Sequence, residues 1–147
     1  MTQLVPELQS LPAGVYDGEL VAFDDGIPYF PDVCSRLLNG DRSIQLVYMV
    51  FDVLALDGHR TMGLPYSERR RLLEQVDLPR DVAVVSDRFE DGRALCGVAV
   101  ERGLEGVVAK RLDGRYVPGE RGWVKTKNRE TWWRYELERE GAFATRR

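Results

Sequence analysis

Lysine, histidine and cysteine are scarce in this sequence of 147 residues. It contains three lysines, one histidine (His59) and two cysteines, Cys34 and Cys96, which are far apart. A zinc site of cysteine and histidine needs more ligands at closer spacing, so the sequence argues against one. It also lacks an apolar run near the roughly 20 residues of a membrane helix and the basic start and apolar core of a signal peptide. We therefore expect a cytoplasmic protein that does not enter a membrane.

Strong charge of one sign is also missing. The net charge is -3 at pH 7, which argues against a surface that is basic throughout and binds nucleic acid everywhere. Any contact with DNA would be local, and the arginine-rich segments are where we expect it. With 44% hydrophobic and 31% charged residues, the composition is that of one globular domain with its own core, not of a disordered segment.

The lysines that are present are grouped. They are Lys110, Lys125 and Lys127, whereas the other eighteen basic residues are arginines. An ammonium contacts a phosphate as a compact point charge, while a guanidinium is a planar fork of donors. The three lysines could be grouped by chance. The pattern favours the alternative that arginine cannot replace lysine at these three positions.

Residues 122–127 form the first candidate for a binding strand. They are a short apolar run that carries charges and is bounded by turn residues, which is typical of a buried strand with a functional edge. Trp123, Lys125 and Lys127 share one face because side chains alternate along a strand. Two ammonium groups on one face repel unless an anion such as a polyphosphate lies between them. The alternative is a solvent-facing edge strand whose lysines discourage aggregation. The spacing of the lysines alone supports the two interpretations equally.

Residues 104–110 form a second run of the same kind. Glu105 stands at its start and could hold the divalent metal that accompanies a polyphosphate. Lys110 stands at its end. The two are an odd number of residues apart, so in a regular strand Lys110 faces away from Glu105, and only a bend would bring both into one pocket.

The first part of the chain predicts a hairpin. Residues 15–23 have the pattern of a strand, and an Asp-Gly turn leads into residues 27–30. Asp17 and Glu19 would share one face of the first strand. Such acids are either solvated carboxylates of an edge strand or contacts to a nucleotide or metal.

A short helix over residues 31–38 and a central strand over residues 44–56 come next. The strand is the most apolar segment of the chain and is rich in β-branched and aromatic residues. Within it, Phe51 is most simply a core residue. An aromatic ring beside an acid at the end of a buried strand could instead stack on a nucleobase.

The rest of the pattern alternates helices and strands. We expect a helix over residues 67–76 with Ser67 as its N-cap, a strand over residues 82–85, and a helix over residues 91–102. The three consecutive arginines of the first helix are interpreted as a solvated face, with contact to a DNA backbone as the alternative. The fold class is therefore α+β, with mixed or antiparallel sheets and flanking helices.

Four segments in this order resemble the adenylation domain of ATP-dependent DNA ligases, which belong to the covalent nucleotidyltransferases. They are Asp17-Gly18-Glu19-Leu20-Val21, Phe51-Asp52-Val53-Leu54-Ala55-Leu56-Asp57-Gly58, Glu105-Gly106-Val107-Val108-Ala109-Lys110 and Trp123-Val124-Lys125-Thr126-Lys127. One such motif is a weak signal, but four in order are a strong one. The resemblance implies a partial nucleotidyltransferase fold, similar to ATP-grasp, over residues 15–128.

The resemblance also implies roles for single residues. Glu19 would contact the ribose or the metal, Phe51 would stack on adenine, and Glu105 would bind the metal. Lys125 and Lys127 would neutralise the α-phosphate while the leaving pyrophosphate develops charge. Lys110 is carried over with them as a catalytic residue. The implied cofactors are ATP and Mg²⁺ or Mn²⁺, and the implied partner is nicked double-stranded DNA in repair, recombination or replication.

Two parts of the family pattern have no counterpart here. Members form lysyl-AMP through an upstream Lys-x-Asp-Gly motif, but no lysine precedes Lys110. About 20 residues follow Lys127, too few for an OB-fold domain. We therefore expect a truncated ligase, with residues 1–14 a lead-in and residues 129–147 a charged tail.

Three interpretations of this departure stay open. The chain is part of a ligase that needs a separate chain with the missing motif, a non-catalytic remnant that binds ATP or nicked DNA, or a decayed fragment that folds poorly. Whether the chain is an enzyme by itself is not decided by the sequence.

Overall fold

Strand β4 (Val47–Leu56) is the centre of a four-stranded mixed sheet in the computed structural model, which describes residues 8–120 and 122–131. β1 (Gly14–Val21) pairs with it. Also paired with β4 are β5 (His59–Arg60), which is antiparallel, and β6 (Ala83–Val85), which is parallel. The expected central strand is thus confirmed, and so is the α+β class with a mixed sheet.

β1 is packed closely against β4 through glycines. A Cβ atom on Gly14 would meet the carbonyl oxygen of Ala55, and one on Gly18 would meet that of Met49. The earlier residue of β1 thus lies against the later residue of β4, so the two strands run antiparallel. The glycines allow a backbone approach that a larger residue would prevent.

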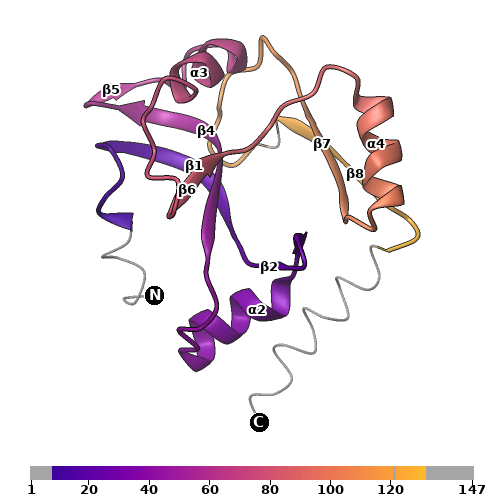
Figure 1. Ribbon diagram of the computed structural model, residues 1–147. Coiled ribbons are helices and arrows are strands. Elements are labelled where there is room, and N and C mark those ends of the chain that lie inside the picture. Colours follow the sequence, from indigo (N-terminus) through magenta and orange to yellow (C-terminus); the bar gives the residue numbers. More distant parts are fainter. Residues whose placement is uncertain (1–7, 121, 132–147) are drawn as a thin grey trace. The chain divides into compact units, whose positions relative to one another are not determined.

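Helix α3 (Tyr66–Leu73) packs on this sheet and closes the main core (Figure 1). The core consists of Val50, Val53, Leu73, Leu78 and Ala83, which are all buried. Partly buried apolar side chains of β1, β4 and the segment after α3 surround them. Apolar residues of β4 and α3 are thus removed from water together, which favours folding by roughly 25 cal/mol per Å² of apolar surface.

The start of α3 differs from the prediction. The N-cap position belongs to Pro65, without a side-chain hydrogen bond, and not to Ser67. The backbone N–H of Ser67 instead donates to the carbonyl oxygen of Leu112, at 2.9 Å. Ser67 therefore lies inside the first turn of α3, where a distant loop satisfies its backbone N–H.

The chain divides into two compact units. Unit 1 comprises Met1–Leu20, Val47–Asp87 and Lys110–Trp123, and thus holds the β4 sheet and α3. Unit 2 comprises Val21–Leu46, Arg88–Ala109 and Val124–Arg147. Residues 1–7 of the proposed lead-in and residues 132–147 of the proposed charged tail lie outside the described residues, and Gly14, the last residue of the lead-in, already belongs to β1.

Unit 2 contains the predicted hairpin and first helix. β2 (Phe23–Asp24) pairs with β3 (Ile27–Pro28) across Asp25 and Gly26, which have φ angles of 47° and 77°. Two consecutive positive φ angles are the mark of the tight Asp-Gly turn of a hairpin. α2 (Phe30–Cys34) then continues as a π-helical segment, η1 (Ser35–Asn39).

The second helix and the last two strands complete unit 2. α4 (Gly92–Glu101) begins at the N-cap Asp91, whose side chain accepts hydrogen bonds from the backbone N–H groups of Arg93 and Ala94. β7 (Gly106–Lys110) and β8 (Trp123–Lys127) form a two-stranded sheet. Contrary to the expectation of buried strands, every residue of β8 is exposed.

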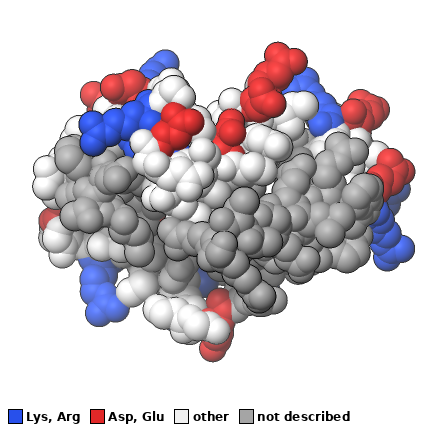
Figure 2. Space-filling view, turned by 90° about the horizontal axis from the view of Figure 1, so that it is seen from below, with Lys and Arg blue, Asp and Glu red and all other residues white. Residues whose placement is uncertain are grey.

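The exposed surface carries both signs of charge. On the face drawn in Figure 2, lysines and arginines of the described residues alternate with aspartates and glutamates. Among the described residues there is no helix long and apolar enough to cross a membrane.

Candidate functional site

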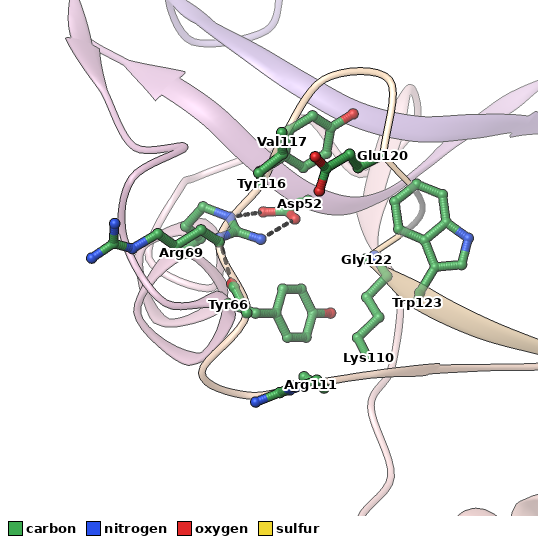
Figure 3. A pocket seen from close by; sticks show the side chains of 12 residues that line it. Asp52, Tyr66, Arg69, Lys110, Arg111, Tyr116, Val117, Glu120, Gly122 and Trp123 are labelled. Atoms are coloured by element: carbon green, nitrogen blue, oxygen red, sulfur yellow. Dashed lines mark hydrogen bonds and ion pairs between the residues drawn. The ribbon is translucent and has the colours of Figure 1, made fainter.

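Lys110 reaches into an aromatic pocket of unit 1. Its Nζ atom is 4.3 Å from the centre of the Phe51 ring, 5.0 Å from that of Tyr66 and 5.8 Å from that of Trp123. Asp52, Arg69 and Tyr116 also line the pocket. Figure 3 shows the Lys110 side chain beside Tyr66, with Trp123 close to it. The structure thus joins two predicted site residues, Phe51 and Lys110, which are far apart in the sequence.

The electrostatics of Lys110 follow from its surroundings. Burial lowers the pKa of the ammonium from the usual value for lysine, and the neighbouring Arg70 and Arg69 act in the same direction. The carboxylates of Asp52 and Asp17 oppose this shift in pKa. A lysine with a lowered pKa in a pocket is a common feature of functional sites, although buried structural groups show it too.

Asp52, directly after Phe51, forms a buried ion pair with Arg69. The Arg69 Nε and Nη2 atoms donate to the two carboxylate oxygens, each at 2.8 Å, and both side chains are only 3% exposed. Oδ1 of Asp52 also accepts from the backbone N–H of Val53. This bidentate contact, seen in Figure 3, fixes α3 against β4 beside the aromatic ring.

Arg69 also holds the loop between β7 and β8. Its Nη1 atom donates to the carbonyl oxygens of Leu64, at 2.6 Å, and Gly114, at 3.1 Å. The guanidinium lies near the rings of Tyr66 and Tyr116, at 5.6 and 5.9 Å from their centres. One side chain therefore positions the strand, the helix and the loop that surround the pocket.

The expectation of a solvated arginine face on α3 is wrong for two of its three residues. Arg69 and Arg70 are each 3% exposed, and only Arg71 faces solvent, paired with Glu68 at 3.1 Å. Arg70 donates to the carboxylate of Glu74 and to the carbonyl oxygen of Ser86. Buried guanidinium groups need such partners, which only the tertiary structure supplies.

Tyr66 is a member of the pocket that the sequence did not indicate. It lies at the start of α3, and its hydroxyl donates to the carbonyl oxygen of Phe51 at 3.4 Å. Burial is the largest cause of its raised pKa. Its ring and that of Phe51 flank the same ammonium. A Pro-Tyr sequence before a helix carries no signal of such a role.

Glu105 and Lys125 meet in unit 2. The carboxylate of Glu105 and the ammonium of Lys125 form an ion pair of 2.9 Å, with both side chains about half exposed. Lys127 is exposed on the same strand as Lys125, as are the other residues of β8. Gly106 lets β7 lie close to β8. Its φ is 152°, and a Cβ atom at this position would meet the backbone of Thr126.

The two metal ligands expected from the resemblance, Glu19 and Glu105, lie in different units. Glu19 is exposed on β1 and belongs to unit 1, whereas Glu105 belongs to unit 2. Within the described part of the chain, no group of three or more acidic, histidine or cysteine side chains could hold a metal. A magnesium ion that is held mainly by substrate phosphates needs only one or two carboxylates, so the donors fit a metal that arrives with a nucleotide.

Phe51 is half-buried and does not belong to the main core, and its ring contacts the ammonium of Lys110. Asp52 and Arg69 were missed as a pair because their sequence separation of 17 carries no periodic signal.

The fold is similar to that of the ligase domain of DNA ligase D. The structure matches a mycobacterial DNA ligase D complexed with ATP and MES, with a TM-score of 0.65 and 37% identity over 78% of this chain and 38% of that chain. The ligase domain of LigD from M. tuberculosis gives a TM-score of 0.64 and 38% identity, and the match covers 78% of this chain and 37% of that one.

The chain belongs to the family described as ATP dependent DNA ligase domain, whose model matches residues 6–127. It is 38% identical over 120 residues to the multifunctional non-homologous end joining DNA repair protein LigD of Mycobacterium tuberculosis, a match that covers 80% of this chain and 15% of that protein. It is 39% identical over 124 residues to a DNA ligase of Methanocorpusculum labreanum, covering 77% of this chain and 22% of that protein.

The SPbeta prophage-derived DNA ligase-like protein LigB of Bacillus subtilis is 35% identical over 135 residues. That match covers 87% of this chain and 50% of LigB. The chain thus spans half or less of the length of these relatives.

Proposed function

We propose that the chain forms the nucleotide-binding part of an ATP-dependent DNA ligase, which seals nicked double-stranded DNA through enzyme-AMP and DNA-adenylate. The observation that carries this proposal is the contact between the half-buried ring of Phe51 and the ammonium of Lys110, which itself lines the pocket. An aromatic ring offers a stacking surface for a base, and an ammonium offers charge for a phosphate. The M. tuberculosis relative is named a repair protein, which supports a role in DNA repair.

The remaining family residues take electrostatic roles in this proposal. Lys125 and Lys127 neutralise the α-phosphate, and Glu105 and Glu19 hold a divalent cation that arrives with ATP. Mg²⁺ or Mn²⁺, when bound, would neutralise phosphate charge and stabilise the leaving pyrophosphate. The ion pair between Glu105 and Lys125 supports this division, because a carboxylate and an ammonium at 2.9 Å offer one contact each to a metal and a phosphate.

The adenylation step requires an amine that attacks the α-phosphorus. A P–N bond forms, the bond from the α-phosphorus to the bridging oxygen breaks, pyrophosphate leaves, and the amine loses a proton. The 147 residues contain no Lys-x-Asp-Gly sequence. In this proposal another polypeptide segment, such as a separate chain in the same cytoplasm, supplies that lysine.

The first test measures ATP affinity by calorimetry in the presence of Mg²⁺. Phe51→Ala should weaken binding roughly tenfold, because stacking contributes about 1–3 kcal/mol per base. Phe89→Ala is the matched control, since Phe89 is 60% exposed and lies in unit 2, outside the pocket. A folded wild-type chain without measurable ATP affinity would contradict the proposal.

The second test incubates the chain with Mg²⁺ and ATP labelled at the α-phosphate, followed by a denaturing gel. We expect covalent label only when a polypeptide with the Lys-x-Asp-Gly motif is added, together with sealing of a nicked duplex. ATP binding without label or sealing in that mixture would favour the non-catalytic binding role instead. Label on the chain alone would place the nucleophile at one of its own three lysines.

A further inference from the structure

The ammonium of Lys110 occupies the place where the proposed function puts a nucleobase. Its Nζ atom is 4.3 Å from the centre of the Phe51 ring, and the rings of Tyr66 and Trp123 are both within 6 Å of the same atom. A planar base that stacks on the face of the Phe51 ring that Lys110 covers requires the same space. Base stacking and this position of Lys110 are therefore mutually exclusive.

The ammonium is held in this place by weak interactions. Within residues 8–120 and 122–131, no carboxylate is within ion-pair distance of it. Asp52, the acid that acts most strongly on the pKa of Lys110, already uses both of its carboxylate oxygens to accept from Arg69. Burial destabilises the charged form of Lys110 and lowers its pKa. The attraction between the ammonium and the aromatic rings offsets part of this cost. A ligand with an anionic group offers the ammonium a better partner than the rings do.

We propose that Lys110 makes the pocket select a nucleoside phosphate over the free nucleoside, because its ammonium covers the Phe51 ring until a phosphate draws it away. This rests on the proposed function, from which it takes the stacking role of Phe51. A free nucleoside has to displace the ammonium and gives it no anion in return. A nucleotide displaces it and pairs with it.

The choice of lysine at this position is consistent with that role. The chain uses arginine for all but three of its basic residues. A guanidinium stacks on aromatic faces more extensively and would hold the ring more firmly, whereas an ammonium on a flexible four-carbon stem leaves it more easily.

The test compares the affinities of the full-length chain for adenosine and for ATP, measured by calorimetry for wild type, Lys110→Met and Lys110→Arg. We expect Lys110→Met to bind adenosine about three- to tenfold more tightly, because an uncharged thioether is held on the ring less strongly than an ammonium, and ATP roughly tenfold more weakly, because a charge is lost. Lys110→Arg should still prefer ATP to adenosine but bind both more weakly than wild type, because the guanidinium holds the ring more firmly. If Lys110→Met does not fold, judged by its near-ultraviolet spectrum, Lys110→Gln replaces it.

Lys125→Met is the control variant. It shows whether the effect of Lys110→Met comes from the position of Lys110 over the Phe51 ring or only from the loss of a positive charge. It removes an ammonium that pairs with Glu105 and has no contact with an aromatic ring among the described residues. We expect it to weaken ATP binding without tightening adenosine binding.

Two results would overturn this inference but leave the proposed function in place. In the first, wild type binds ATP, but Lys110→Met binds adenosine no more tightly than wild type does. In the second, Lys110→Met binds both adenosine and ATP more weakly than wild type does. A folded wild-type chain and Lys110→Met variant that bind neither ligand would overturn the proposed function as well, so the two failures are distinguishable.

Discussion

Arg69 makes more structural contacts than any other charged side chain of the pocket. It pairs with Asp52 through two hydrogen bonds and donates to two backbone carbonyl oxygens, while being 3% exposed. Removing two charges from water is costly, and this geometry offsets the cost by satisfying their hydrogen-bonding groups. Each partner therefore depends on the other.

Asp52→Asn should lower the free energy of unfolding by about 3–5 kcal/mol, because it leaves the Arg69 guanidinium buried without a counter-charge. Urea denaturation followed by circular dichroism measures the change. Glu68→Gln is the control, since its pair with Arg71 is exposed and should contribute less than about 1 kcal/mol. Equal losses in the two variants would contradict the account of the buried pair.

Lys110 should titrate at a lower pH than an ordinary lysine, because burial disfavours its charged form. With three lysines in the chain, carbon NMR of labelled lysine side chains resolves each one, and the signal missing in Lys110→Arg identifies it. The unfolded chain then binds more protons between the folded pKa and the ordinary value, so this group makes stability rise with pH through that window. A Lys110 titration at or above the ordinary value would contradict the account.

At the scale of the elements, glycines at close backbone approaches decide which strands can pair. Gly106 at the start of β7 has a φ of 152°, and a Cβ atom there would collide with the carbonyl oxygen of Thr126 in β8. Gly97, within α4, has no atom within 4 Å of the position of a Cβ. The two glycines therefore predict opposite effects of the same substitution.

Gly106→Ala should destabilise the chain by more than about 1 kcal/mol, because both its φ angle and its contact with β8 become strained. Gly97→Ala, the matched control, should stabilise it by about 0.5–1 kcal/mol through helix propensity. Thermal unfolding of both variants measures these effects. A neutral or stabilising Gly106→Ala would show that the close approach to β8 is not needed.

At the scale of the whole molecule, a ligand that binds only the folded chain raises its stability. ATP at about 100 times its Kd should add about 2.7 kcal/mol and raise the Tm by roughly 5–10 °C for a chain of this size. Thermal scans with and without Mg²⁺ and ATP test this prediction. Phe51→Ala should reduce the shift at the same ATP concentration, and its full retention would argue that ATP binds elsewhere.

The sequence by itself determined the class of fold, the order of most elements and the family. Alternation and turn residues carry that information locally, so the central strand β4 and helix α4 are close to their predicted bounds. The Asp-Gly turn is where it was expected, although the strand predicted over residues 15–23 is divided between β1 and β2. Four ordered motifs supplied the resemblance, and the family match over residues 6–127 confirms it.

Only the tertiary structure decided the environment of each charge. Whether an arginine on α3 faces water or a buried Asp52, and whether Lys110 lies against Phe51, depends on contacts between residues 17 and 59 positions apart. No local period encodes such contacts, because they arise when β4, α3 and the loop before β8 exclude water from one another. The pocket is therefore a property of packing, while the elements that form it are properties of the sequence.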